Sequence, residues 1–147
     1  MRTKKISPKI ITFLESYKTA FERLDADAIA DLFVYPLHIT GDDEQITPAS
    51  IGSREEWTNH LRGLLAKYRT LGFSSPNILD LSVIELSPRL FQATVHWDLR
   101  DRADSSLYNF TAVYTLIEIG RNLRIAAIAH NELPRLRAQL NGISTSA

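Results

Sequence analysis

The spacing of the apolar residues changes from helical to alternating about halfway along the 147-residue chain. In the first half, apolar side chains recur as on one face of a helix, at Ile10, Phe13, Leu14, Tyr17, Phe21 and Leu24. In the second half, four segments have the character of strands: 78–86, 90–99, 107–119 and 123–129. Helices followed by a series of antiparallel strands predict an α+β domain rather than a βαβ alternation.

Capping and breaking residues divide the helical half into three helices. Pro8 suits the first turn of the first helix, and Asp25 is placed to cap a second, short helix that Pro36 ends. Ser53, with Glu56 three residues further on, is the signature of a capping box before a third helix. The apolar face of that helix comprises Trp57, Leu61, Leu64, Leu65 and Tyr68. Two short strands are expected between the second and third helices, one over 37–40 and one ending near residue 51.

The chain reads as one domain, because no linker rich in Pro, Gly or Ser and no repeat divides it. We expect this domain to span residues 8–140, with flexible tails at 1–7 and 141–147. A closing helix is predicted from Leu133, Leu136 and Leu140, with Asn131 as its N-cap.

Composition excludes several functional classes. Lys plus Arg and Asp plus Glu number 17 each, so no overall field favours nucleic acid or an anionic membrane as a partner. The absence of cysteine excludes disulfides and thiolate chemistry, and the lack of a long apolar segment or signal peptide leads us to expect a cytoplasmic location. The four histidines, at 38, 60, 96 and 130, lack metal-ligand spacing, and no phosphate loop is present. We therefore expect neither a metal nor a cofactor.

The predicted sheet has apolar residues on both faces, and the helices can cover only one of them. Val95, Trp97 and Val113 favour burial of the other face against a second copy of the chain, so we expect a symmetric homodimer through the sheet. A solvated second face is the alternative.

The order of these elements resembles the NTF2-like superfamily of cystatin-like α+β rolls, which includes ketosteroid-isomerase-like and SnoaL-like proteins. The resemblance is carried by residues 13–17, 24–33, 51–57 and 122–127, and it spans about Pro8 to Leu140. It implies a cone, in which the helices pack in the concave face of a curved mixed or antiparallel sheet around an apolar pocket. Members of the superfamily bind or chemically convert small hydrophobic molecules, or serve as dimerisation modules.

The resemblance carries over only one of the three catalytic roles of the ketosteroid isomerases. Tyr17 matches the tyrosine that donates to the oxyanion from the first helix. Where those enzymes have their general base, an aspartate, this sequence has Thr40 and Gly41, with Asp42 just beyond. Their second donor, a protonated acid on a later strand, has no acidic counterpart near residues 112–114. The resemblance therefore does not imply steroid isomerase activity.

Three residues are candidates for catalysis: Tyr17, His96 and Asp98. A buried Tyr17 hydroxyl needs a partner, which is either a ligand oxygen or a backbone carbonyl or water. His96 and Asp98 share one face of a strand. With a hairpin centred near Ala103, that face also carries Tyr108, Phe110, Ala112 and Tyr114, which would suit proton transfer. In the rival arrangement, Ala93, Val95, Trp97 and Leu99 face the helices instead, and alternation alone does not choose between the two.

The expected pocket lining consists of Phe13, Phe21, Phe33, His38, Trp57, Leu61, Tyr114 and His130. His38 faces outward if Leu37 and Ile39 face the core.

Two functional hypotheses follow. In the first, the cone binds, or binds and isomerises, dehydrates or hydrolyses, a small hydrophobic molecule. In the second, side chains fill the cone and the protein is a non-catalytic dimerisation or protein-interaction module.

Overall fold

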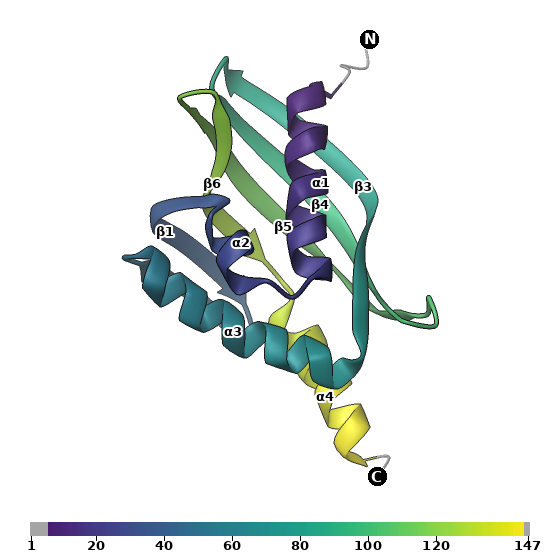
Figure 1. Ribbon diagram of the computed structural model, residues 1–147. Helices are drawn as coiled ribbons and strands as arrows, with labels where there is room; N and C mark the ends of the chain where they lie inside the picture. The colour runs from purple at the N-terminus through teal and green to yellow at the C-terminus, as the bar shows by residue number, and fades with distance from the viewer. Residues whose placement is uncertain (1–5, 146–147) are drawn as a thin grey trace.

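The computed structural model describes residues 6–145, which form four helices and one six-stranded sheet (Figure 1). The helices are α1 (Pro8–Glu22), α2 (Ala26–Ala30), α3 (Arg54–Leu71) and α4 (Leu133–Thr145). The strands are β1 (Phe33–Asp42), β2 (Ile46–Ile51), β3 (Phe73–Ser87), β4 (Leu90–Asp101), β5 (Ser106–Ile119) and β6 (Asn122–His130). The predicted α+β class is confirmed.

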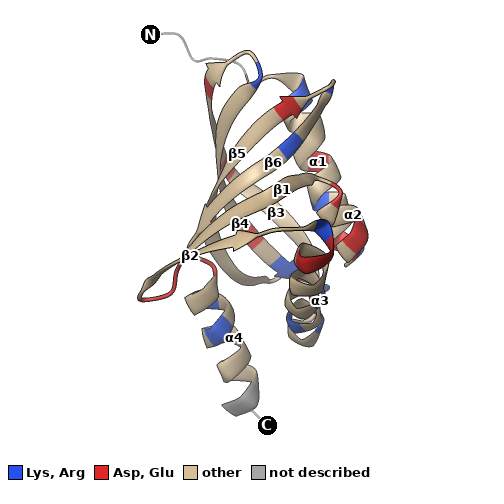
Figure 2. Ribbon diagram, turned by 90° about the vertical axis from the view of Figure 1, so that its left-hand side faces the viewer, with Lys and Arg blue, Asp and Glu red and all other residues tan. Residues whose placement is uncertain are grey.

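The sheet has the order β2-β1-β6-β5-β4-β3 and curves around the helices. Neighbouring strands are antiparallel, except that β1 and β6 run parallel. Helix α1 crosses the concave face, and α3 lies across the open lower end of the sheet, beside α4 (Figure 1). In the view of Figure 2, α1, α2 and α3 all lie to one side of the strands, so the helices cover one face only.

The helix boundaries follow from local sequence signals. The Asp25 carboxylate accepts the Ala28 N–H at 3.0 Å and caps α2. At the start of α3, the Ser53 hydroxyl accepts the Glu56 N–H at 3.2 Å, while the Glu56 carboxylate accepts the N–H of Gly52 at 2.9 Å. Both predicted caps are confirmed. Helix α3 ends at Gly72, whose φ of 77° lies in the left-handed region.

Strand β4 turns its odd-numbered residues towards the helices. Trp97 pairs with Phe110, and Leu99 pairs with Tyr108. The register is interrupted between Leu99 and Arg100, which adds one residue to the hairpin on one side. The prediction that a hairpin centred near Ala103 places Tyr108, Phe110, Ala112 and Tyr114 on the face of His96 is therefore wrong, because a one-residue change in register reverses the face.

Three further expectations are corrected. Pro36 does not end α2, which stops at Ala30; it lies inside β1. Asn131 does not cap α4; its side-chain oxygen accepts the Thr111 N–H at 2.9 Å and ties the end of β6 to β5. Residues 141–145 belong to α4 rather than to a tail, while 1–5 and 146–147 lie outside the described residues. Within residues 6–145, no helix is long and apolar enough to cross a membrane.

Candidate functional site

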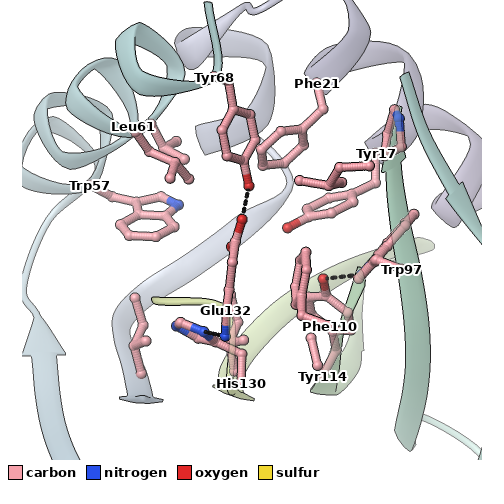
Figure 3. A pocket seen from close by; sticks show the side chains of 16 residues that line it. Tyr17, Phe21, Trp57, Leu61, Tyr68, Trp97, Phe110, Tyr114, His130 and Glu132 are labelled. Carbon is pink, nitrogen blue, oxygen red and sulfur yellow. Dashed lines mark hydrogen bonds between the residues drawn. The ribbon is translucent and has the colours of Figure 1, made fainter. Parts of the chain in front are cut away.

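A cavity lies between α1, α3 and the concave face of the sheet (Figure 3). Its inner chamber has a volume of about 80 Å³, and its walls are mainly aromatic and aliphatic. The residues labelled in Figure 3 are Tyr17, Phe21, Trp57, Leu61, Tyr68, Trp97, Phe110, Tyr114, His130 and Glu132. The chamber has room for a small ring or a branched group of a few heavy atoms.

An outer groove of about 530 Å³ adjoins this chamber, between α3, the β1–β2 hairpin and the start of α4. The chamber and the groove share the lining residues Ile39, Trp57, Leu61, Leu64, His130 and Glu132. The two cavities are therefore adjacent, with these side chains between them, and we refer to them together as the funnel. Its outer part falls within the range of roughly 300–1,000 Å³ that is usual for small-molecule sites.

Glu132 carries the most unusual chemical group in this funnel. It lies two residues beyond the end of β6, immediately before α4, and is only 7% exposed. Its Oε2 atom accepts hydrogen bonds from the hydroxyl groups of Tyr68 and of Tyr108, the latter at 2.8 Å. Burial raises the pKa of the Glu132 carboxyl, and these two hydrogen bonds oppose the rise. Both phenols bind Oε2, and neither binds Oε1.

The two phenols come from different layers of the fold. Tyr68 lies on the last turns of α3, and Tyr108 lies near the start of β5. Burial raises the pKa of each hydroxyl, and the neighbouring Glu132 carboxylate raises it further. Both tyrosines are therefore neutral hydrogen-bond donors, and they hold Glu132 in place where the chamber adjoins the groove.

His130 lies next to Glu132 and is held by the backbone. Its Nδ1 atom accepts the Glu132 N–H at 3.1 Å (Figure 3). The neutral ring therefore carries its proton on Nε2. Burial lowers the pKa of His130, which favours this neutral form.

Tyr17 is the centre of an aromatic cluster at the inner end of the chamber. Its ring centroid lies 4.9 Å from that of Phe21, 5.6 Å from that of Tyr114 and 6.0 Å from that of Trp97. The indole N–H of Trp97 donates to the Tyr114 hydroxyl at 2.9 Å. Burial raises the pKa of Tyr17 well above its ordinary value, and the nearby Tyr114 and Glu132 add to this.

The indole N–H of Trp57 has no hydrogen-bond partner among the described residues, although the nitrogen is buried. Its ring packs edge-on against Phe33, with centroids 5.3 Å apart. Figure 3 shows the nitrogen on the side of the ring that faces the chamber. The donor is directed towards the chamber, but neighbouring side chains cover the nitrogen, so an oxygen or nitrogen acceptor has to displace them to reach it.

The structure brings together Tyr17, Phe21, Trp57, Leu61, Tyr114 and His130 of the predicted site. The other predicted lining residues lie elsewhere: Phe13 and Phe33 are in the core, and His38 is exposed on the convex face. Within residues 6–145, no group of His, Asp or Glu side chains is arranged to hold a metal ion.

His96 and Asp98 also lie on the convex face, away from the funnel. His96 is 3.3 Å from the Asn109 side-chain oxygen. The buried Asp98 accepts hydrogen bonds from Arg100, at 2.8 Å, and from Ser106. These bonds fasten the β4–β5 hairpin, so the two residues are not placed to act with Tyr17.

Sequence reasoning missed Glu132 and the roles of Tyr68 and Tyr108. A signal for Glu132 was present. Ile128 and His130 face the funnel, and continuing their alternation by two residues leads to Glu132. The strand itself ends at His130, so the alternation had to be extended beyond it.

A sequence model of the family described as NTF2-like protein (DUF6841) matches residues 7–133. The chain belongs to this NTF2-like family. Among curated proteins, none matches the chain significantly.

Solved structures share the NTF2-like fold at low sequence identity. An NTF2-like protein with a cystatin-like fold from Novosphingobium aromaticivorans has a TM-score of 0.66 and 16% identity, over 90% of this chain and 86% of its own. The protein Aln2 from a Streptomyces species has a TM-score of 0.68 and 14% identity, over 87% and 94%. A protein from Xanthomonas campestris, provisionally named a calcium/calmodulin-dependent protein kinase II association domain, has a TM-score of 0.62 and 12% identity, over 89% and 90%. These similarities concern the fold of the NTF2-like domain and not its activity.

Proposed function

We propose that the funnel binds a small, mostly apolar molecule that presents an oxygen acceptor to Trp57. The unpartnered, buried indole N–H of Trp57 is the observation that carries this proposal. An unsatisfied buried donor costs about 1–3 kcal/mol, and a ligand oxygen within hydrogen-bonding distance recovers that cost. Apolar walls with a few polar groups are the usual construction of a small-molecule site.

The shape of the funnel sets the size of the molecule. The inner chamber of about 80 Å³ takes a small ring or branched head between Tyr17 and Trp57, and the groove of about 530 Å³ takes the remainder. Glu132 lies where the two parts meet. Its carboxyl and the Tyr17 hydroxyl are the groups placed to exchange a proton with the bound molecule, should the protein also convert it.

The test follows the indole N–H signals of the two tryptophans by ¹H–¹⁵N NMR. We expect acetophenone to move the Trp57 signal downfield, because its carbonyl oxygen accepts the N–H, and to leave Trp97 hydrogen-bonded to Tyr114. The matched probe is α-methylstyrene, which has the same shape but no oxygen, and Trp57→Phe assigns the signal. Equal shifts with both probes, or no shift with either, would refute the proposal.

A second candidate function, a non-catalytic dimerisation module, is supported by the small inner chamber and the uncovered sheet face. Side chains fill most of the cone, leaving only about 80 Å³ in its inner part. The convex face is not covered by any element within residues 6–145, and its strands are largely uncharged (Figure 2). Its middle consists of the half-buried or exposed Thr94, Thr111, Val113, Thr115, Ala127 and Ala129. The Xanthomonas campestris neighbour is itself named as an association domain.

A further inference from the structure

The carboxyl group of Glu132 is buried without a cationic side chain beside it. Within residues 6–145, no Lys, Arg or His forms an ion pair with it, and its hydrogen-bond donors are the neutral phenols of Tyr68 and Tyr108. Buried carboxylates are ordinarily paired with a cation, because the isolated charge is costly to remove from water. The funnel therefore offers an uncompensated acidic group to whatever enters it.

Within residues 6–145, the elements around Glu132 place no cationic side chain where it neutralises the carboxyl group. The titratable groups that line the chamber or groove are Tyr17 on α1, His60, Lys67 and Tyr68 on α3, Tyr114 on β5 and His130 on β6, with Tyr108 bonded to Glu132 from β5. Lys67 and His60 are exposed at the outer groove. On α4, Arg137 pairs with Asp43, and Arg135 donates to the Asn131 carbonyl at 2.9 Å.

Aromatic rings surround the same position. Tyr17, Phe21, Trp57, Tyr68 and Phe110 all line the chamber that Glu132 borders. The faces of such rings attract cations, and the attraction is greater in a site that excludes water. A single acidic group within several aromatic side chains is a setting that suits an organic cation better than a metal ion, which prefers several oxygen or nitrogen ligands.

We propose that the molecule bound by the funnel carries an ammonium group, which pairs with Oε1 of Glu132 and lies against the aromatic rings. This inference rests on the proposed small-molecule function and adds the charge of the ligand to it. The oxygen acceptor that Trp57 requires then belongs to the same molecule, so the chemical class is a small amino alcohol, amino ether or amino ketone.

The proposal predicts coupling between binding and the protonation of Glu132. Burial raises the pKa of this carboxyl in the free protein, and a bound cation lowers it again. Below the pKa of the free protein, the cation must therefore displace a proton from Glu132. The affinity of the protein for the cation should rise with pH by up to about ten-fold per pH unit and then level off.

Choline and 3,3-dimethylbutan-1-ol are suitable probes, because they share shape and hydroxyl group but differ in charge. We expect choline to bind the wild-type protein roughly ten-fold more tightly or better at about pH 8, as measured by NMR titration. The permanent charge of choline ensures that any dependence on pH arises in the protein. Glu132→Gln should abolish the preference, whereas Glu55→Gln, which removes an exposed carboxylate outside the funnel, should preserve it.

Equal affinities for the two probes, or a preference that survives in Glu132→Gln, would overturn the proposal. If the alcohol binds and shifts the Trp57 signal but choline binds no better, the ammonium inference fails and the small-molecule function stands. If neither probe binds and neither acetophenone nor α-methylstyrene shifts the Trp57 signal, both proposals fail.

Should Glu132→Gln not fold, calorimetry of the wild type at about pH 5 in two buffers of different ionisation enthalpy replaces the titration of that variant. Proton release on binding choline supports the inference, and its absence refutes it.

Discussion

At the scale of single residues, the polar groups of the funnel form one connected set. Glu132 receives two phenol hydrogen bonds, and its backbone N–H is fixed by His130. The side chain is therefore held in one position without an opposite charge. In such an arrangement the neutral form of the carboxyl is favoured up to a higher pH than in an exposed glutamate. The stability of the fold therefore depends on pH.

Glu132→Gln should change that dependence in a defined direction. The carboxyl binds its proton more tightly in the folded than in the unfolded chain, where its pKa is near the ordinary value of 4.5. The wild type therefore loses stability as the pH rises from about 4.5 through the folded-state pKa, by roughly 1.4 kcal/mol per unit of difference. Glutamine does not titrate. The free energy of unfolding of the variant, measured with urea, should therefore rise relative to that of the wild type between about pH 4 and about pH 8.

The control is Glu55→Gln, whose stability relative to the wild type should change much less over the same range, because this side chain is exposed. A wild type that gains stability relative to Glu132→Gln as the pH rises would contradict the raised pKa. The opposing dependence of His130, whose lowered pKa makes the fold less stable in acid, is common to both proteins and cancels in the difference.

Residue facing was predictable on α1 and α3 but not in the hairpin of β4 and β5. Helical spacing fixes one buried stripe, so Tyr17, Trp57 and Leu61 were placed correctly from their intervals alone. Alternation along β4 gives two equivalent faces. The choice depends on packing and on the register shift between Leu99 and Arg100, which propensity does not encode.

At the scale of elements, α3 positions much of the funnel. It contributes Trp57 and Leu61 near its start and Tyr68 near its end, and it borders both the chamber and the groove. Its beginning is set by a capping box and its end by Gly72. The start was predicted because capping is a local property of the sequence, and Gly72, which the prediction did not use, is an equally local signal for the end. The extension of α4 through Gly142 could not be predicted, because glycine usually marks a helix end.

Two glycine substitutions associated with α3 should have opposite effects on stability. Gly72 has a φ of 77°, so Gly72→Ala should cost about 1 kcal/mol, although no atom lies within 4 Å of the added methyl group. Gly63 lies inside the helix with open space around it, so Gly63→Ala should gain about 0.5–1 kcal/mol. Thermal and urea unfolding of the two variants measure this. Changes of the same sign would show that local backbone conformation does not decide the outcome.

At the scale of the whole molecule, the helices bury one face of the sheet and leave the other open. Val95 and Trp97, which suggested a buried convex face, lie on the concave side, 0% and 2% exposed. Val113 remains on the convex face and is half-buried. The case for a homodimer therefore depends on the small uncharged residues around Val113, whose neighbours across the strands are Thr94 and Ala129.

Val113→Lys tests the homodimer that we propose for this face. If two copies bury their convex faces together, a lysine in the middle of each brings like charges into a desolvated contact, and the dimer should dissociate. Sedimentation velocity should then show a dimer for the wild type and a monomer for Val113→Lys. Ala66→Lys adds the same charge on the exposed side of α3 and should remain dimeric.

A wild type that sediments as a monomer would refute pairing through the sheet. A dimer that persists in Val113→Lys would place the interface elsewhere. In either case the funnel proposal would stand, because the chamber and groove that define it are lined by residues of a single chain.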